Sequence, residues 1–304
     1  MTMSTDAAEL FAPWEMHIGG WVELQTAIND LTSMYARDAF VWRGQSDASW
    51  GLHSSLSRTL AGVIGRYPTE SELVDAEKQL LQRARIDWRL DGIPALQLFA
   101  QMQHVGVPTR LLDVSFNPLI AAWFAVARDG KTDDEDARLL VFSDKNKPVQ
   151  LNSQWNANRP RWHFLDSDHA RRHVNWGTGL GRKIWRPPAL HARISAQNAA
   201  FLLDGVPIDS PDGYSLGRDT RSWSAAQLRE VTSIPMRFAH AREGRLPVEN
   251  APVFTYRIAA SAKAEIRDQL ERRFGYRFAT VYADIEGLAE YVKRWPTEAL
   301  LSSN

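Results

Sequence analysis

The chain has 304 residues, of which 44% are hydrophobic and 24% charged, and its 36 basic and 36 acidic side chains cancel. This composition is typical of a folded globular protein, and the balanced charge gives no overall attraction to nucleic acid or to an anionic membrane. The absence of cysteine excludes disulfides, thiolate nucleophiles and Cys-bound zinc. No stretch approaches the roughly 20 apolar residues that span a bilayer, and residues 1–15 lack the apolar core of a secretory signal, so we expect a cytoplasmic chain.

The first part of the chain predicts two amphipathic helices and one strand. Apolar residues recur at helical spacing over 21–31, and an apolar run predicts a strand over 39–43. Thr69 and Glu72 form a capping-box pattern, in which each side chain bonds the backbone of the other residue. A helix is therefore expected to begin there.

Two further helices enclose a polar segment. One starts near Pro94 and is expected to end before Gly106, which suits the left-handed conformation that follows a helix, and Pro108 prevents continuation. The other begins with Asn117 as N-cap and Pro118 at the first helical position. Its body is apolar on all sides, which predicts a helix buried on most of its surface.

The remaining chain alternates strands and helices loosely, apart from an irregular segment at about 145–190, and this alternation favours a mixed α/β or α+β fold. The expected elements are strands over 138–142, 252–258 and 280–282, a helix over 262–274 that Gly275 stops, and a last helix that Asp284 caps.

The end of the first strand carries a candidate binding site. Arg43 can bind a phosphate or a carboxylate through two parallel hydrogen bonds, and Gly44 permits close approach of a backbone. Gln45 adds a further polar contact. The structural alternative is an arginine that pairs with an acid such as Asp113.

A second cluster places four polar residues within ten positions between two helices. His104 lies at a helix end, where the helix dipole favours its protonated form. Thr109 and Arg110 follow it, and Asp113 can either orient His104 or clamp Arg110. A buried Arg110–Asp113 pair that only holds the loop is the structural alternative.

The middle of the chain is basic and rich in tryptophan. From Arg159 to Arg193 there are eight Arg or Lys against two Asp, with three tryptophans among them. Positive charge beside aromatic rings suits nucleic acid, whereas the alternative is an insertion whose arginines pair with acids such as those at 133–136. The nucleic-acid hypothesis rests on Arg171, Arg172, Arg182 and Lys183.

Several motifs lie along the chain. They are Trp42-Arg43-Gly44-Gln45, Trp50 to Arg58, Gln103 to Asp113 with the following Ser115, Asn117, Pro118 and Ala121–Ala125, Arg193 to Phe201 as a strand, Ser261-Ala262-Lys263, and Asp284 to Ala289. Together they resemble the FRG domain family, and the resemblance extends from about residue 20 to residue 294. It implies tails at 1–18 and 297–304, an FRG domain at 19–296, and a basic, Trp-rich insertion at about 145–190.

The layout of that family resembles the ADP-ribosyltransferase superfamily. The resemblance implies an α+β fold with a mixed, largely antiparallel split sheet flanked by helices. It also implies that NAD is a substrate that contacts Arg43, Gly44, Gln45, Thr109, Arg110 and Ser115, and that catalysis involves Arg43, His104, Asp113 and Gln197.

The resemblance leaves the catalytic acid open. Gln197 stands where a Glu or Gln acts at the nicotinamide ribose, but an uncharged amide cannot act as a base. Transfer would then be weak, would use another acid such as Glu230 or Asp204, or would be absent.

The leading hypothesis is therefore an NAD-binding FRG-domain protein that transfers ADP-ribose to a macromolecule in bacterial defence, toxin or phage-defence biology. The alternatives are a non-catalytic module that binds nucleotide or nucleic acid, and a structural interaction domain. Residue spacing predicts no metal site and no membrane partner, and it leaves the oligomeric state open.

Overall fold

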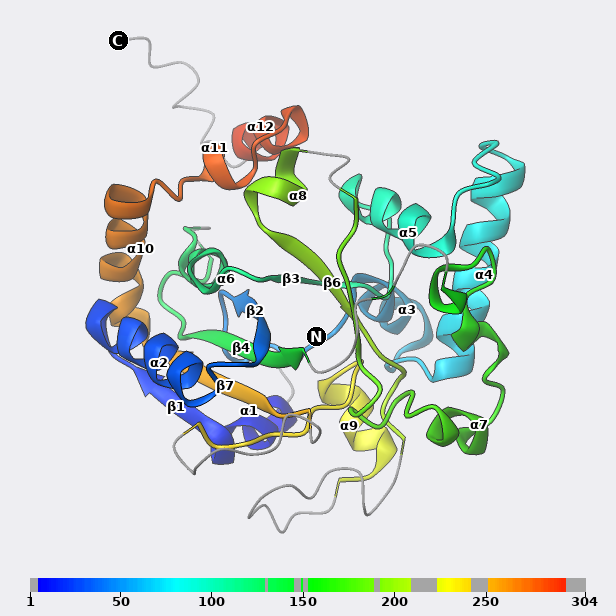
Figure 1. Cartoon of the computed structure of the whole chain (residues 1–304), viewed down its shortest axis with the longest axis horizontal. Helices are drawn as coiled ribbons and strands as arrows, with labels where there is room; N and C mark the ends of the chain where they lie inside the picture. The colour runs from blue at the N-terminus through cyan, green and yellow to red at the C-terminus, as the bar shows by residue number, and fades with distance from the viewer. Residues whose placement is uncertain are drawn as a thin grey trace.

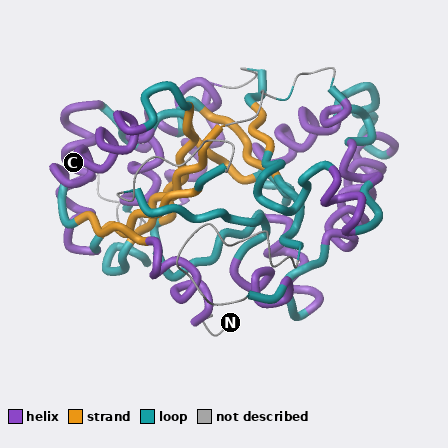
Figure 2. The backbone as a smooth tube through the Cα atoms, turned by 60° about the horizontal axis from the view of Figure 1, so that its bottom comes forward, coloured by secondary structure: helices purple, strands orange, loops and turns teal. Residues whose placement is uncertain are grey.

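Seven strands form one sheet in a computed structural model that describes residues 5–128, 131–144, 149, 153–188, 192–208, 223–241 and 251–293. The strands are β1 (Glu15–Ile18), β2 (Ala39–Gln45), β3 (Leu112–Ser115), β4 (Ala137–Asp144), β5 (Lys183–Trp185), β6 (Ala199–Leu203) and β7 (Val253–Ile258). Their order is β1-β7-β4-β2-β3-β6-β5, in which β1 and β7 are parallel and the other neighbours antiparallel. The sheet runs through the middle of the molecule between helices (Figures 1 and 2).

The helices pack into separate cores around the sheet. On one face, apolar residues of α2 (Trp21–Met34), α6 (Pro118–Val126) and α10 (Ala260–Phe274) share a core with β1, β2, β4 and β7. On the other face α1 (Thr5–Phe11) and α9 (Ala225–Val231) pack on the central strands. A third core joins α4 (Glu70–Ile86) and α5 (Ala95–His104) to β5 and β6. Figure 1 shows α2 and α10 at one end of the molecule and α4 at the other.

Shorter elements complete the described chain. They are α3 (Ser55–Ile64), α7 (Asp168–His173), α8 (Ala192–Ala196), α11 (Phe278–Val281), α12 (Ile285–Lys293), and the 3-10 helices η1 (Ala12–Trp14), η2 (Gln154–Asn156) and η3 (Arg161–Phe164). Among the described residues, no helix combines the length and the hydrophobicity needed to cross a membrane.

Alternation along the central strands assigns side chains to the two faces. In β4, Leu139 and Val141 pack with α6 and α10, whereas Leu140 and Phe142 pack with α1 and α9. All four are at most 1% exposed. The sheet is therefore buried on both faces at this strand, and the predicted mixed α+β class with a mostly antiparallel sheet is confirmed.

The start and stop signals in the sequence are confirmed where the structure describes them. Thr69 and Glu72 form both bonds of the capping box at the start of α4. The side chain of Asn117 accepts from the backbone of Leu119 at the start of α6. Gly275 ends α10 in the left-handed conformation, with a φ of 69°. These signals are local, so they hold without knowledge of the fold.

Two predicted strands differ from the structure. Residues 280–282 are not a strand: Phe278 and Tyr282 stack at 4.5 Å, four residues apart, which is a helical contact that helix α11 provides. The predicted strand over 193–201 is divided into helix α8 and strand β6.

The N-terminal segment predicted as a tail also differs, because β1 within it adds to the sheet beside β7. The predicted C-terminal tail at 297–304 lies outside the described residues.

Lys263 of α10 is a buried cation that holds two loops together. Its side chain is 1% exposed, and its ammonium donates to the carbonyl oxygens of Ser46, Thr132 and Glu135 at 2.9, 2.5 and 3.0 Å. Three donors and three carbonyls match the capacity of an ammonium group. The loop after β2 and the loop before β4 are thus tied to one helix.

We expect Lys263→Met to destabilise the protein because the carbonyls of Ser46, Thr132 and Glu135 lose the ammonium group that donates to all three, at a cost on the order of 3 kcal/mol. The measurement is the free energy of urea unfolding. Lys78→Met is the matched control, because the Lys78 side chain is 45% exposed on α4 and should change stability little. Equal stability of the two variants would contradict the assigned role of Lys263.

Candidate functional site

The sheet opens between β2 and β3. Strand β2 pairs with β4 over its whole length, but it pairs with β3 only at Trp42 and Ser115. Beyond that pair β2 and β3 no longer pair as neighbouring strands, and a cavity of about 330 Å³ lies between them. The seven strands nevertheless form one connected sheet and not the split sheet that the resemblance implied, because the Trp42–Ser115 pair joins β2 to β3.

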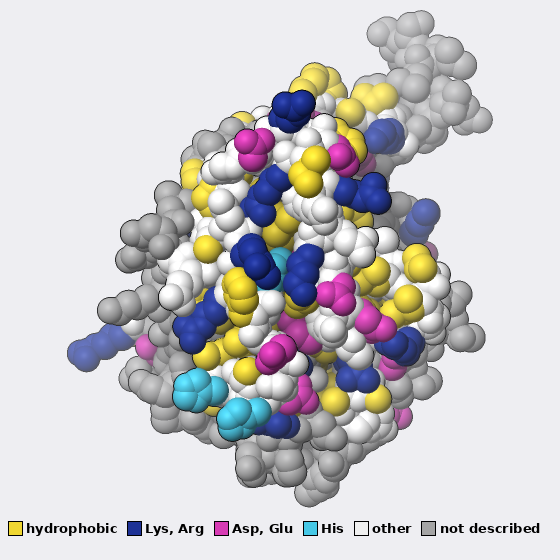
Figure 3. Space-filling view, turned by 90° about the vertical axis from the view of Figure 1, so that its right-hand side faces the viewer, with side chains coloured by type: hydrophobic (Ala, Val, Ile, Leu, Met, Phe, Trp, Pro, Cys, Tyr) yellow, Lys and Arg dark blue, Asp and Glu magenta, His cyan; other side chains and the backbone are white. Residues whose placement is uncertain are grey.

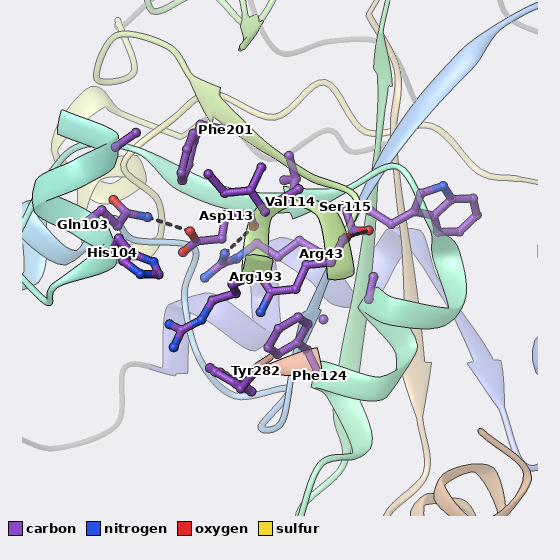
Figure 4. A pocket seen from close by; sticks show the side chains of 17 residues that line it. Arg43, Gln103, His104, Asp113, Val114, Ser115, Phe124, Arg193, Phe201 and Tyr282 are labelled. Atoms are coloured by element: carbon purple, nitrogen blue, oxygen red, sulfur yellow. Dashed lines mark hydrogen bonds between the residues drawn. The ribbon is translucent and has the colours of Figure 1, made fainter. Parts of the chain in front are cut away.

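Seven parts of the chain contribute to the wall of the cavity, and Figure 4 shows their side chains converging on it. The lining residues are Trp42, Arg43 and Gly44 of β2, Asp113, Val114 and Ser115 of β3, Ala199 and Phe201 of β6, Ala100, Gln103 and His104 of α5, Ala121 and Phe124 of α6, and Arg193, Ile194, Gln197 and Tyr282 near α8 and α11.

Arg43 bridges the opening in the sheet. Its Nη1 donates to the backbone oxygen of Asp113 at 2.6 Å, so a guanidinium occupies the place of a strand-to-strand bond. Burial lowers the pKa of Arg43, the negative charge of Asp113 opposes that shift, and the positive charge of Arg58 adds to it. Within the described chain, no carboxylate oxygen comes within 4.0 Å of this guanidinium. The expected structural pairing with the Asp113 carboxylate is therefore wrong, because the contact is to the backbone.

Gly44 allows helix α6 to lie directly on β2. A Cβ at this position would stand 2.0 Å from the carbonyl oxygen of Ala121 and 2.6 Å from the backbone nitrogen of Ala125. The close approach predicted for Gly44 is thus made by a helix. Gln45 is buried and donates to the carbonyl of Gly51 at 3.1 Å, and it does not line the cavity.

Asp113 presents a carboxylate to the cavity. Its neighbours Leu112 and Val114 face the core beneath α1 and α9, so alternation turns Asp113 the other way. Its Oδ1 accepts from Nε2 of Gln103 at 2.8 Å (Figure 4). Thr109, which is buried outside the cavity wall, donates to the oxygen of the same amide and so fixes its orientation.

His104 faces a different acid from the one expected. Its Nε2 lies 3.7 Å from Oδ2 of Asp284, whereas Asp113 is bonded to Gln103. The other oxygen of Asp284 accepts from Nη2 of Arg193 at 2.7 Å. Burial alone would raise the pKa of Asp284, but the hydrogen bonds and positive charge around it, with Arg193 foremost, lower it. A charged group and its counter-ion therefore close one side of the cavity.

Three potential metal ligands meet at this side. His104, Asp284 and Glu286 offer ligand atoms that lie within 4.8 Å of one another, a grouping that residue spacing did not predict. The Arg193 guanidinium is already 2.7 Å from one oxygen of Asp284, and its charge opposes a cation there. The grouping is better explained as an ion pair and a helix cap, since Asp284 also accepts from the backbone of Gly287.

Gln197 and Ser115 meet across the cavity floor. The Ser115 hydroxyl donates to the backbone oxygen of Gln197 at 2.6 Å and accepts from the backbone of Asn117. The Gln197 amide donates to the carbonyl of Val281 at 3.1 Å. Both residues line the cavity as expected, and both are uncharged.

Arg110 does not reach the cavity. It forms ion pairs with Glu70 at 2.9 Å and Glu77 at 2.5 Å, and it lies 5.6 Å from the ring centres of both Trp162 and Trp176. Burial acts to raise the pKa of Glu77, but the attraction of Arg110 and the hydrogen bonds lower it to about 2. The expected ligand contact and the expected Asp113 pair of Arg110 are both wrong, because two buried glutamates occupy its guanidinium.

Two arginines of the basic middle segment are buried in the core. Arg171 and Arg182 are 6% and 2% exposed, and their guanidinium groups bond to Asp168 and to backbone carbonyls. These two arginines therefore offer no surface charge to a nucleic acid. Arg172 is exposed, and the ammonium of Lys183 lies 4.8 Å from the ring centre of Trp155. Figure 3, which faces α4 and α7, shows basic side chains interspersed with acidic and apolar ones.

The two alternative acids lie outside the cavity wall. Asp204 is 2% exposed and accepts from the backbone nitrogens of Gly177 and Gly205, both at 2.7 Å. Burial raises its pKa to about 6, against those two hydrogen bonds. Glu230 accepts from the backbone of Tyr67 at 3.4 Å. Among the residues that line the cavity, Asp113 is the carboxylate.

Residue patterns missed several members of the site. Arg193 and Gln103 lie inside recognised motifs, but nothing local distinguished them from structural residues. Phe124 and Tyr282 supply aromatic walls, and Tyr282 comes from the segment predicted as a strand. The spacing of Phe278 and Tyr282 is the signal that could have placed that wall.

These features define a mixed α+β domain whose site lies in an opening of its sheet. Comparison with protein families matches residues 38–134 to the FRG domain. This match agrees with the FRG resemblance of the motifs, and the matched range includes both Arg43 and Asp113. A search of curated proteins and a search of solved structures each found no match.

We expect Gly44→Ala to disrupt folding because its methyl group would overlap the backbone of α6. Gly62→Ala in α3 is the matched control, since nothing lies within 4 Å of a Cβ there. Replacing glycine inside a helix should stabilise the control by about 1 kcal/mol. Thermal melts of both variants test this, and a Gly44→Ala variant as stable as the parent would contradict the packing.

Asp204 should make stability depend on pH. Because its folded pKa is about 6 against an ordinary 3.8, the folded protein holds this proton more tightly than the unfolded chain. Stability is greatest below the ordinary pKa and falls as pH rises to about 6. The loss is roughly 3 kcal/mol for a shift of about two units. Urea unfolding from pH 4 to 7 should show this fall in the parent and not in Asp204→Asn. Parallel pH profiles for the parent and Asp204→Asn would refute this prediction. Asp75→Asn, at an exposed position, is the control.

Proposed function

We propose that the cavity binds NAD or a closely related nucleotide, and that the protein transfers ADP-ribose from NAD to a macromolecule. One observation carries the proposal. Arg43, His104 and Gln197, which the ADP-ribosyltransferase analogy takes from three distant motifs, line a single cavity. The carboxylate of Asp113 lies in the same wall. The analogy with ADP-ribosyltransferases supports the proposal because it assigns roles to these residues.

The size and lining of the cavity suit part of a nucleotide. Its volume of about 330 Å³ falls at the lower end of ordinary small-molecule sites, which range over about 300–1,000 Å³. Phe124, Tyr282 and Phe201 give the wall an aromatic part, against which a nicotinamide ring can pack. The guanidinium of Arg43 matches the geometry of a phosphate.

The reaction requires stabilisation of positive charge at the ribose. The bond from ribose C1′ to the nicotinamide nitrogen breaks, its electron pair leaves with neutral nicotinamide, and the ribose becomes an oxocarbenium-like cation. A nucleophile of the acceptor then forms a new bond to C1′, and its proton passes to a base. Asp113 supplies the carboxylate that both steps need, since a negative charge stabilises the cation and can accept the proton.

Gln197 is assigned a positioning role in this scheme. Its amide carries no charge and already donates to the carbonyl of Val281. It therefore orients ribose hydroxyls by hydrogen bonding, and it neither removes a proton nor balances the cation. Asp113 thus takes the role of the acid that is missing at the position of Gln197.

The setting proposed for this activity is bacterial defence against phage, or toxin biology, and it follows from the family resemblance. The partner would be a macromolecular acceptor. A module that binds a nucleotide without turning it over is the alternative, and the same experiment separates the two.

We expect the protein to bind NAD in calorimetry and to release nicotinamide from it in the presence of an acceptor. Asp113→Asn keeps an acceptor for Gln103 but removes the charge, so nicotinamide release should fall by about 10²- to 10³-fold with little change in NAD affinity. Arg43→Gln should weaken NAD binding itself by about tenfold or more.

Three outcomes decide between the hypotheses. Absence of NAD binding by the parent protein would overturn the proposal. Binding without nicotinamide release, over a range of acceptors, would favour the non-catalytic module. Full activity of Asp113→Asn would remove this carboxylate from the mechanism, and thermal melts of each variant control for folding.

A further inference from the structure

A second hollow adjoins the cavity. Its volume is about 120 Å³, and it lies between the end of β2, the start of α3 and the segment that leads into β3. Arg43, Gln103 and Asp113 line both spaces. Figure 4 shows these three side chains lying together in the cavity wall. These three residues, which are hydrogen-bonded to one another through Asp113, therefore form a wall common to the two spaces, and a group bound in the hollow would contact the same Arg43 as a ligand in the cavity.

The charges that line the hollow are predominantly positive. Arg43 and Arg58 both face it, and Asp113 is its carboxylate. His53 adds no charge at neutral pH, because burial lowers its pKa to about 4 and the nearby Arg58 adds to that shift. In the described part of the chain, no carboxylate oxygen lies within 4.0 Å of either guanidinium. The hollow thus has two guanidinium groups against one carboxylate, which is itself bonded to Gln103.

Arg58 is held in place by a neutral partner. Its Nη1 donates to the carbonyl of His53 at 2.5 Å, and the ring of His53 stacks on Tyr67 at 3.6 Å. One of its five N–H groups is accounted for in this way, and the side chain is exposed. The other N–H groups can reach an incoming anion without breaking an ion pair.

The serine hydroxyls of the hollow are already used. The Ser54 oxygen accepts from the backbone of Ser57 at the start of α3. The Ser55 hydroxyl exchanges two hydrogen bonds with the backbone of Thr109. The affinity of the hollow for a ligand therefore depends on the two arginines, and hardly on the helix start.

We infer that this hollow binds a phosphoryl group of the nucleotide, held between Arg43 and Arg58. The inference rests on the proposed function and adds to it a second ligand contact and a ligand class: a nucleotide with a phosphate on the side away from the aromatic rings. A phosphate accepts bidentate bonds from guanidinium groups and balances the excess charge. Its source is either the phosphate next to the nicotinamide ribose or the second phosphate of the dinucleotide.

The test is calorimetric titration with NAD, nicotinamide mononucleotide, nicotinamide riboside and inorganic pyrophosphate. The proteins are the parent, Arg58→Gln, Arg58→Lys and Arg37→Gln, whose arginine is exposed in the loop before β2. Arg58→Gln should weaken NAD and pyrophosphate by roughly tenfold to a hundredfold, because hydrogen bonds to a charged group are lost. The affinity of Arg58→Lys for these two ligands should lie between those of the parent and Arg58→Gln. Riboside binding by every variant at Arg58 and all binding by Arg37→Gln should be unchanged.

The other outcomes are equally definite. A parallel loss for the mononucleotide assigns the hollow to the phosphate next to the nicotinamide ribose, and a loss confined to NAD assigns it to the second phosphate; both support the inference. Unchanged NAD and pyrophosphate binding by Arg58→Gln would overturn the inference, as would an equal loss for the riboside.

The same data separate this inference from the proposed function. If the parent binds no NAD but binds pyrophosphate through Arg58, the proposed function fails and the phosphoryl site stands. If Arg58→Gln binds NAD normally, only the phosphoryl site fails.

Discussion

The contact between Arg43 and the backbone of Asp113 is the interaction on which the site depends. Strands β2 and β3 share one registered pair, and where the ladder stops a guanidinium spans the gap and satisfies the Asp113 carbonyl at 2.6 Å. Without it, a carbonyl at the edge of the opening would lose its donor. Gly44 fixes the other side of the opening, because α6 lies against its backbone. The cavity is thus a consequence of how the sheet is joined.

Two arginines of the core and the two arginines of the hollow differ in their partners. Arg110 is matched by Glu70 and Glu77 of α4, and Arg138 of β4 is matched by Glu15 of β1, so the first pairing holds a helix to the sheet and the second joins two strands. Arg43 and Arg58 have no such partner among the described residues, and both line the hollow. A cation that the protein leaves without an acid, in a place that a small molecule can reach, is suited to bind an anion. This distinction supports a nucleotide site better than the number of basic residues does.

The sequence predicted much of the fold through local signals. The capping box at Thr69, the Asn117 cap and the Gly275 stop each depend on a few neighbouring residues, and the structure confirms all three. The short strand expected at 280–282 failed for the opposite reason. A run of three residues carries too little periodicity, and packing of the Phe278 and Tyr282 rings decided in favour of a helix.

The candidate site could be predicted only in part. By itself, the sequence determined the two polar segments around Arg43 and Asp113 and the FRG resemblance that joins them. Tertiary structure alone decided that Arg110 serves two buried glutamates, that Asp284 rather than Asp113 faces His104, and that Arg58 shares a hollow with Arg43. The physical reason is that an ionic partner is chosen by distance and burial in space. Sequence spacing specifies those quantities within a helix or a strand, but not between them.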